Sequence, residues 1–279
     1  MRRWLFFIYG AACHLLFLGT FAYMAAFVGN FVVTKSIDSA TDEPLARAML
    51  IDLTLLALFG IQHSVMARPA FKRIWTRIIP EPIERSTYVL VSCGVTILLM
   101  WQWRSIDDVV WNAQHSWLRG LLWGLFAIGW LLVPLASLLI NHFDLFGTRQ
   151  VWLHLRGRDY QALPFRAPFF YKHVRHPLYV GWAIAFWATP TMSVGHLLFA
   201  GVLTGYMGLA ALLEEHDLIA HFGDQYESYR RRVPMFVPRW NAAASIPQAS
   251  NSADSQSSRA RVTTTPELAA ERTNSTNVW

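Results

Sequence analysis

Long apolar runs, almost free of charged residues, recur along this chain and decide what it can fold into. A helix needs about 20 apolar residues to cross the hydrocarbon core of a bilayer. Backbone groups in lipid find no water to bond, so a spanning segment is a helix or part of a closed barrel, and continuous runs lack the alternation of barrel strands. The runs cover residues 5–33, 49–66, 88–103 with their flanks, and 118–140. We therefore predict an all-α fold, a polytopic helical bundle in a membrane.

The composition excludes an ordinary soluble domain. Hydrophobic residues make up 54% of the chain and charged residues 15%, against about 25% charged in a typical soluble domain. The net charge of +6 comes mainly from loops between the apolar runs, where basic residues set membrane orientation, so we expect lipid and no nucleic acid as a partner. Cys13 and Cys93 lie inside apolar runs without metal-type spacing, and we predict no bound metal. No obligate protein partner is evident.

A fifth apolar region covers residues 178–213 and is interrupted by Pro190 and Gly195. It is too long for one crossing and suits two shorter helices folded as a C-terminal hairpin. Basic residues gather in the loops 68–85, after 140 and at 230–232, while the loops 34–48 and 104–117 are poorer in them. Because basic loops stay inside, this alternation favours the hairpin over a single helix. We predict five or six transmembrane helices, in a bacterial inner membrane, with both termini and the active site cytoplasmic.

The chain divides into three parts. Residues 1–140 form a four-helix transmembrane part, and residues 141–240 hold a cytoplasmic interfacial segment, the hairpin and the region of candidate site residues. Residues 241–279 are rich in Ser, Thr, Asn and Ala, so we predict a disordered tail there.

The candidate site begins at the segment RHPLYVGW, residues 175–182. Pro177 fits the first position of a helix, where a missing N–H costs nothing. Arg175 and His176 then precede the positive end of that helix, where an anion is favoured. Tyr179 and Gly181 follow in its first turns, and a glycine there admits a ligand or a neighbouring helix.

A closed hairpin would return acidic residues to this point. Glu214 and Glu215 lie where its second helix leaves the membrane, and Tyr226 and Tyr229 follow on one helical face. Charges at membrane depth are expensive and usually functional, so the convergence predicts a binding site. The alternative is an Arg–Glu pair that only fixes the hairpin.

These segments carry a family resemblance. RHPLYVGW, LEEHDL (213–218) and YESYRRRVPMFVP (226–238) resemble the signature of membrane methyltransferases related to isoprenylcysteine carboxyl methyltransferase. IQHSVMAR (61–68), ERSTY (84–88), NHFDLFG (141–147) and FWATP (186–190) look like the nurim-related group, so the resemblance covers residues 5–238. It implies S-adenosylmethionine as methyl donor. The cofactor-binding residues would be Arg175, His176, Tyr179, Gly181, Glu214, Glu215, Tyr226 and Tyr229.

The resemblance further implies methylation of methanethiol, a small volatile thiol, to dimethyl sulfide. A proton acceptor has to form the thiolate, and the candidates are His176, then His173, with Glu215 behind them. His176 has a competing role as a structural turn residue. Two other functions stay open: carboxyl methylation of an isoprenylcysteine or related lipophilic acceptor, and a non-catalytic nurim-like membrane protein.

Overall fold

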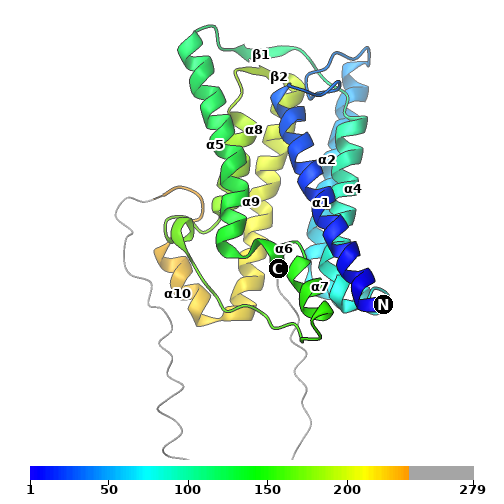
Figure 1. Cartoon of the computed structure of the whole chain (residues 1–279). Coiled ribbons are helices and arrows are strands. Elements are labelled where there is room, and N and C mark those ends of the chain that lie inside the picture. Colours follow the sequence, from blue (N-terminus) through cyan, green and yellow to red (C-terminus); the bar gives the residue numbers. More distant parts are fainter. Residues whose placement is uncertain (239–279) are drawn as a thin grey trace, which may run out of the picture.

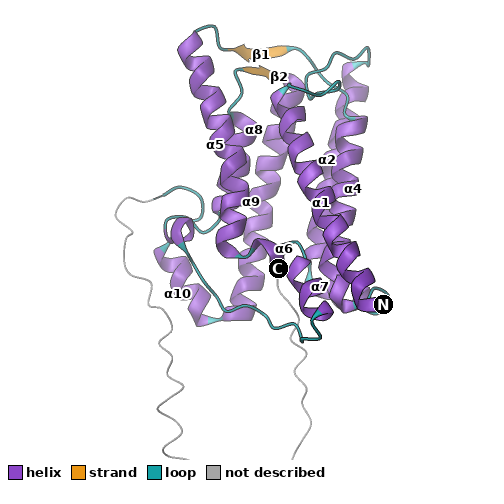
Figure 2. Cartoon of the chain, viewed as in Figure 1, coloured by secondary structure: helices purple, strands orange, loops and turns teal. Residues whose placement is uncertain are grey.

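The computed structural model describes residues 1–238, and the predicted tail 241–279 lies outside that range. Within it, five helices are long and apolar enough to cross a membrane, and a shorter apolar helix packs among them (Figures 1 and 2). They are α1 (Arg2–Gly29), α2 (Leu45–Ala67), α4 (Glu84–Gln102), α5 (Ser116–Ile140), α9 (Val194–Phe222) and the short α8 (Pro177–Trp187). The predicted polytopic all-α bundle is confirmed, and the chain is an integral membrane protein.

The remaining elements gather at the two ends of the bundle (Figure 1). The N-terminus lies at one end, called here the N-terminal end, together with α3 (Pro69–Trp75), η1 (Glu81–Ile83), α6 (His142–Leu145), α7 (Thr148–Leu155) and α10 (Asp224–Arg232). The single turn η2 (Phe169–Lys172) leads into α8. At the opposite end, the sheet end, β1 (Val109–Asn112) and β2 (Thr191–Ser193) pair antiparallel, with Val109 opposite Ser193 and Asn112 opposite Thr191.

The predicted hairpin is confirmed, but its two helices are very unequal. The first, α8, has 11 residues, and the second, α9, has 29. At 1.5 Å per residue α8 is about 16 Å long, roughly half the thickness of the hydrocarbon core. A helix of this length does not cross the hydrocarbon core alone, and the chain reaches the sheet end through β2.

Two glycines set the position of α8 against α5. A Cβ atom on Gly129 of α5 would lie 2.5 Å from the backbone nitrogen of Ala185 in α8. A Cβ atom on Gly181 of α8 would lie 3.1 Å from the backbone nitrogen of Val133 in α5. Small residues allow such close backbone approach in membrane bundles, so this contact fixes the depth at which α8 begins.

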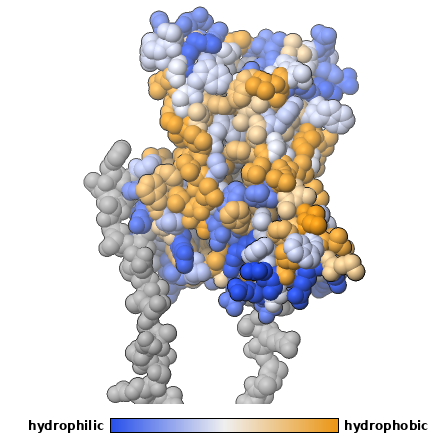
Figure 3. Space-filling model, viewed as in Figure 1, coloured by the Kyte–Doolittle hydropathy of each residue, from blue (hydrophilic) through white to orange (hydrophobic). Residues whose placement is uncertain are grey.

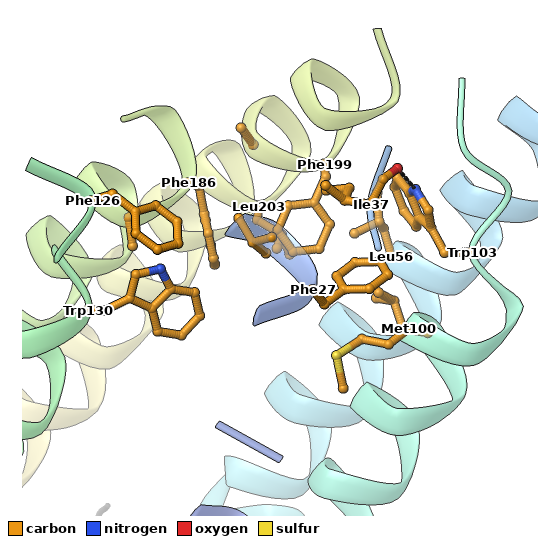
Figure 4. Packing of buried hydrophobic residues seen from close by; sticks show 14 of the residues in the cluster. Phe27, Ile37, Leu56, Met100, Trp103, Phe126, Trp130, Phe186, Phe199 and Leu203 are labelled. Carbon is orange, nitrogen blue, oxygen red and sulfur yellow. Dashed lines mark hydrogen bonds between the residues drawn. The ribbon is translucent and has the colours of Figure 1, made fainter. Parts of the chain in front are cut away.

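A buried aromatic and aliphatic core joins α1, α2, α4, α5, α8 and α9 towards the sheet end (Figure 4). Within it, the fully buried Trp103 donates its indole N–H to the carbonyl of Ile37, 3.2 Å away. On the face seen in Figure 3, apolar residues predominate around the middle of the bundle and hydrophilic residues at both ends. This distribution matches a protein that spans a bilayer.

A buried ion pair ties the start of α4 to α6. Arg85 Nη1 lies 2.6 Å from Asp144 Oδ2, and Arg149 Nη1 lies 3.0 Å from Asp144 Oδ1. The Arg85 and Asp144 side chains are 3% and 4% exposed. Since a buried charge needs its partner, this pair holds the N-terminal end of α4 against α6.

The α5–α8 contact predicts a difference between two glycines of the same helix. Gly129→Ala should destabilise the protein by about 1–3 kcal/mol, because overpacking a close contact forces a backbone shift. Gly124→Ala is the matched control, because a Cβ atom there meets nothing within 4 Å. Thermal unfolding in detergent measures both variants. Equal unfolding temperatures for the two would contradict the proposed role of Gly129.

Candidate active site

The segment before α8 is held in place by the end of the described chain. The backbone N–H of Arg175 donates to the carbonyl of Pro234 at 2.9 Å, and that of His176 to the carbonyl of Met235 at 3.2 Å. Pro177 is the first residue of α8 and His176 its N-cap, as the sequence predicts. Residues 174–176 therefore lie beside residues 234–236, and both are aligned against the start of α8.

The carboxylate of Glu215 on α9 joins this segment to the hairpin. Arg175 Nε donates to Glu215 Oε1 at 2.6 Å, and His176 Nε2 lies 3.1 Å from the same oxygen. The side chains of Arg175, His176 and Glu215 are 10%, 6% and 5% exposed. Arg175 Nη1 also donates to the carbonyls of Arg230 and Val233. The predicted return of the glutamates to Arg175 and His176 is present, and it links α8, α9 and α10.

Glu214 contacts other partners. Its Oε2 accepts a hydrogen bond from the Tyr179 hydroxyl at 2.9 Å and lies 3.7 Å from His176 Nδ1. The rings of His176 and Tyr179 are nearly parallel, with centroids 5.3 Å apart. Glu214 is 30% exposed, six times the value for Glu215. Glu215 is thus the enclosed structural carboxylate, and Glu214 is the one that a ligand can reach.

Both ring nitrogens of His176 face carboxylates, Nε2 towards Glu215 and Nδ1 towards Glu214. The ring also meets Phe236, with centroids 5.9 Å apart. These contacts fix the ring between two acidic groups. Both the structural role of His176 and its role as a proton acceptor stay predictions.

Tyr226 and Tyr229 lie together on α10, as predicted, with ring centroids 5.7 Å apart. Both are almost fully buried, and Tyr229 donates its hydroxyl to the carbonyl of Tyr171 at 2.6 Å. Burial raises the pKa of both hydroxyls, so they remain neutral. The pair packs α10 against α9 and supports the segment that carries Arg175.

Two further candidates lie outside the Glu215 cluster. His173 is exposed and lines an apolar groove together with Leu135, Phe170 and Phe236. Gly181 lies against α5, which is the neighbouring-helix alternative of the sequence analysis. A catalytic role for His173 and a cofactor contact for Gly181 stay predictions.

A second polar group, between α2, α4 and α9, is not evident from the sequence as a group. The Tyr88 hydroxyl on α4 lies 3.0 Å from each ring nitrogen of His63 on α2. Ser64, next to His63, lies with its hydroxyl 3.0 Å from that of Tyr206 on α9. A Cβ atom on Gly60 would be 3.2 Å from the Tyr206 ring, so a glycine brings Tyr206 close to α2. His63 and Tyr88 stand in two segments of the family resemblance, but only the fold brings them together.

A metal site would need several His, Cys, Asp or Glu side chains close together. Among residues 1–238, no group of three or more His, Cys, Asp or Glu side chains is placed to hold a metal ion. Both cysteines are free and buried.

The fold and the site define a polytopic helical membrane protein in which ionised side chains are enclosed where α8, α9 and α10 meet. The chain belongs to the NnrU protein family, whose family model matches residues 50–237.

Curated relatives cover most of the chain. One from Crocosphaera subtropica, named methanethiol S-methyltransferase, is 51% identical over 231 residues, which is 83% of this chain and 91% of that protein. Another of the same name, from Mycobacterium tuberculosis, is 50% identical over 85% of this chain and 98% of its own length. Nurim of Rattus norvegicus is 32% identical over 63% of this chain and 70% of nurim. The predicted likeness to nurim-related proteins is confirmed. No solved structure matches the chain.

Proposed function

We propose that this protein is a membrane methyltransferase that methylates methanethiol to dimethyl sulfide. The observation that carries the proposal is the accessible carboxylate of Glu214 beside Tyr179 and His176 at the start of α8, with the Arg175 guanidinium on the adjacent Glu215. Relatives about half identical over most of the chain carry the name of this activity. The carboxylate, the aromatic rings and the guanidinium are groups suited to a charged organic donor.

The side chains at the start of α8 fit S-adenosylmethionine, which when bound supplies a methyl group on a cationic sulfonium. Glu214 can accept hydrogen bonds from the ammonium or the ribose diol. The face of Tyr179 attracts a cation, as aromatic rings do. Within residues 1–238, Arg175 uses Nε and Nη1 for its hydrogen bonds, so Nη2 could meet a carboxylate of the donor. Tyr226 and Tyr229 would support these residues from behind.

The enclosure of the site favours this chemistry. The side chains of His176 and Glu215 are 6% and 5% exposed. Transfer of a methyl group from a cation to a thiolate removes two charges, and a water-poor environment avoids solvating them. The residues at the start of α8 mainly hold the reactants in line, and alignment alone lowers a barrier substantially.

The arrangement of charges supports a cytoplasmic site. The chain passes along the bundle six times, and α8 with β2 makes the pass that precedes α9. The N-terminus and α10 therefore lie at the same end of the bundle (Figure 1). The basic loop 68–85 and the basic residues 230–232 also lie at this end. Basic loops stay inside. We therefore place the N-terminal end and the active site in the cytoplasm, in a bacterial inner membrane.

Impermeant maleimide labelling of intact cells measures this orientation. The native cysteines are buried, so each introduced cysteine reports its own position. Gln114→Cys, exposed at the sheet end, should react in intact cells. Gln225→Cys, exposed on α10, should react only after the cells are broken. The reverse pattern would contradict a cytoplasmic active site.

A volatile-product assay measures the activity itself. Membranes that contain the protein should release labelled dimethyl sulfide from methyl-labelled S-adenosylmethionine and methanethiol, and control membranes should not. A prenylated cysteine offered in place of methanethiol should not be methylated. Labelling of the prenylcysteine alone would instead indicate the carboxyl methyltransferase function. If the protein neither transfers the methyl group nor binds the cofactor, the result would indicate a non-catalytic protein.

Calorimetry with purified protein measures the proposed cofactor contacts. Glu214→Gln should weaken S-adenosylmethionine binding by about 10- to 100-fold, since a hydrogen bond to a charged group contributes about 1.5–3 kcal/mol. Glu227→Gln is the matched control, because Glu227 is exposed on α10 and pairs with Arg231 alone among the ion pairs formed by residues 1–238. Unchanged affinity in the Glu214 variant would remove Glu214 from the cofactor site.

A further inference from the structure

The polar group of His63, Ser64, Tyr88 and Tyr206 lies beside the stretch of α9 that carries Glu214. The Ser64 hydroxyl on α2 lies 3.0 Å from that of Tyr206 on α9. Arg68, which follows the end of α2, pairs with Asp217 on α9 at 2.8 Å and donates to the carbonyl of Leu213. Glu214 lies between these two contacts along α9, so residues 63–68 run beside the segment that contains it.

These side chains are within reach of a small ligand. His63, Tyr88 and Tyr179 are each only partly buried, and the Glu214 side chain is 30% exposed. Accessible surface is therefore present both on the His63–Tyr88 pair and on the Tyr179–Glu214 pair.

His63 has the surroundings of a neutral base. Its ring stacks on Phe59, with centroids 5.3 Å apart, and meets the Tyr88 hydroxyl at 3.0 Å from both nitrogens. A point equally close to both nitrogens at that distance lies off the ring plane. Tyr88 therefore steadies the ring without filling the in-plane lone-pair direction of either nitrogen. His176 differs, because its two nitrogens already face carboxylates.

We propose that His63 accepts the proton of the thiol, with Tyr88 positioning its ring, so that the His63–Tyr88 pair forms the acceptor side of the active site. This inference rests on the proposed thiol methylation. The S–H bond breaks, its electron pair stays on sulfur, and the proton binds a ring nitrogen of His63. The thiolate sulfur would form a bond to the methyl carbon while the bond from that carbon to the sulfonium sulfur breaks, and the electron pair of the broken bond would stay on the donor as a neutral sulfide. His63 then releases the proton to water, so one proton is produced per methyl group transferred.

The ionisable groups around the pair are few and belong to four helices. Tyr88 itself comes from α4, Tyr179 from α8, and Tyr206 and Glu214 from α9. Arg68 is the C-cap of α2, and its charge is paired with Asp217 on α9 at 2.8 Å. The pH dependence of the reaction should therefore report mainly on His63 and on the thiol.

The pH dependence of kcat/KM for methanethiol tests the proposal. The wild-type enzyme should reach a plateau once His63 is neutral. His63→Gln can use only thiolate formed in solution, so its kcat/KM should rise about tenfold per pH unit up to the pKa of the thiol. The loss should therefore be large at neutral pH and shrink as pH rises. Calorimetric affinity for S-adenosylmethionine should stay unchanged in this variant.

His14→Gln is the matched control, because His14 is also a part-buried intramembrane histidine beside a hydroxyl, that of Thr148 at 3.3 Å. It should keep the wild-type profile. Tyr88→Phe keeps the aromatic ring and should move the acidic limb of the profile, which decides the question if His63→Gln does not fold.

Several results would overturn the proposal. They are a His63→Gln profile parallel to that of the wild type, a loss of S-adenosylmethionine binding in that variant, or an unmoved acidic limb in Tyr88→Phe. An active wild type with any of these results removes the role of His63 alone. A wild type that releases no dimethyl sulfide removes the proposed function itself.

Discussion

The carboxylate of Glu215 is the point on which the site depends. An ionised group enclosed at membrane depth is tolerated only when it is paired and hydrogen-bonded. Glu215 meets this requirement through Arg175 and His176, and Arg175 adds bonds to the carbonyls that end α10. One acidic side chain thus brings together three segments that are far apart in sequence. Glu214 follows from it, because neighbouring residues on a helix point about 100° apart. The helix that directs Glu215 at Arg175 therefore directs Glu214 towards Tyr179.

The depth of the site is set by a different contact, between backbones rather than charges. Gly129 and Gly181 let α5 and α8 approach so closely that α8 cannot slide along its neighbour without a clash. The register of this contact, with Gly181 at Val133, sets the first turn of α8 against the last turns of α5, which ends at Ile140. The polar residues before Pro177 are enclosed there by protein, where interactions between charges are stronger than in water. The site is both enclosed by protein and held at a fixed level in the bundle.

The sequence predicts the crossings and the convergence of the site better than its details. Runs of apolar residues specify where the chain spans, and Pro190 together with the basic residues 230–232 indicates a hairpin that returns Glu214 and Glu215 to Arg175. Glu214 and Glu215 are adjacent in the chain, so the sequence does not indicate which of them pairs with Arg175. Strands of four and three residues are too short to show alternation, so β1 and β2 were not predicted. The unequal hairpin was missed because the α5–α8 contact depends on two glycines 52 residues apart in the printed sequence.

The neutral group on α2, α4 and α9 shows a more general limit of sequence reasoning in membranes. Lipid is as apolar as a protein core, so hydropathy cannot indicate which face of a spanning helix meets another helix. His63 and Tyr88 are 25 residues apart, and Ser64 and Tyr206 are 142 apart, and neither pair has a spacing that predicts contact. Their chemistry nevertheless complements that of the Glu214 side. Hydroxyls and a histidine that bond one another cost less to enclose than unpaired ions. These side chains carry no charge of their own. In the proposed reaction a neutral thiol can therefore arrive from lipid and lose its proton only beside His63.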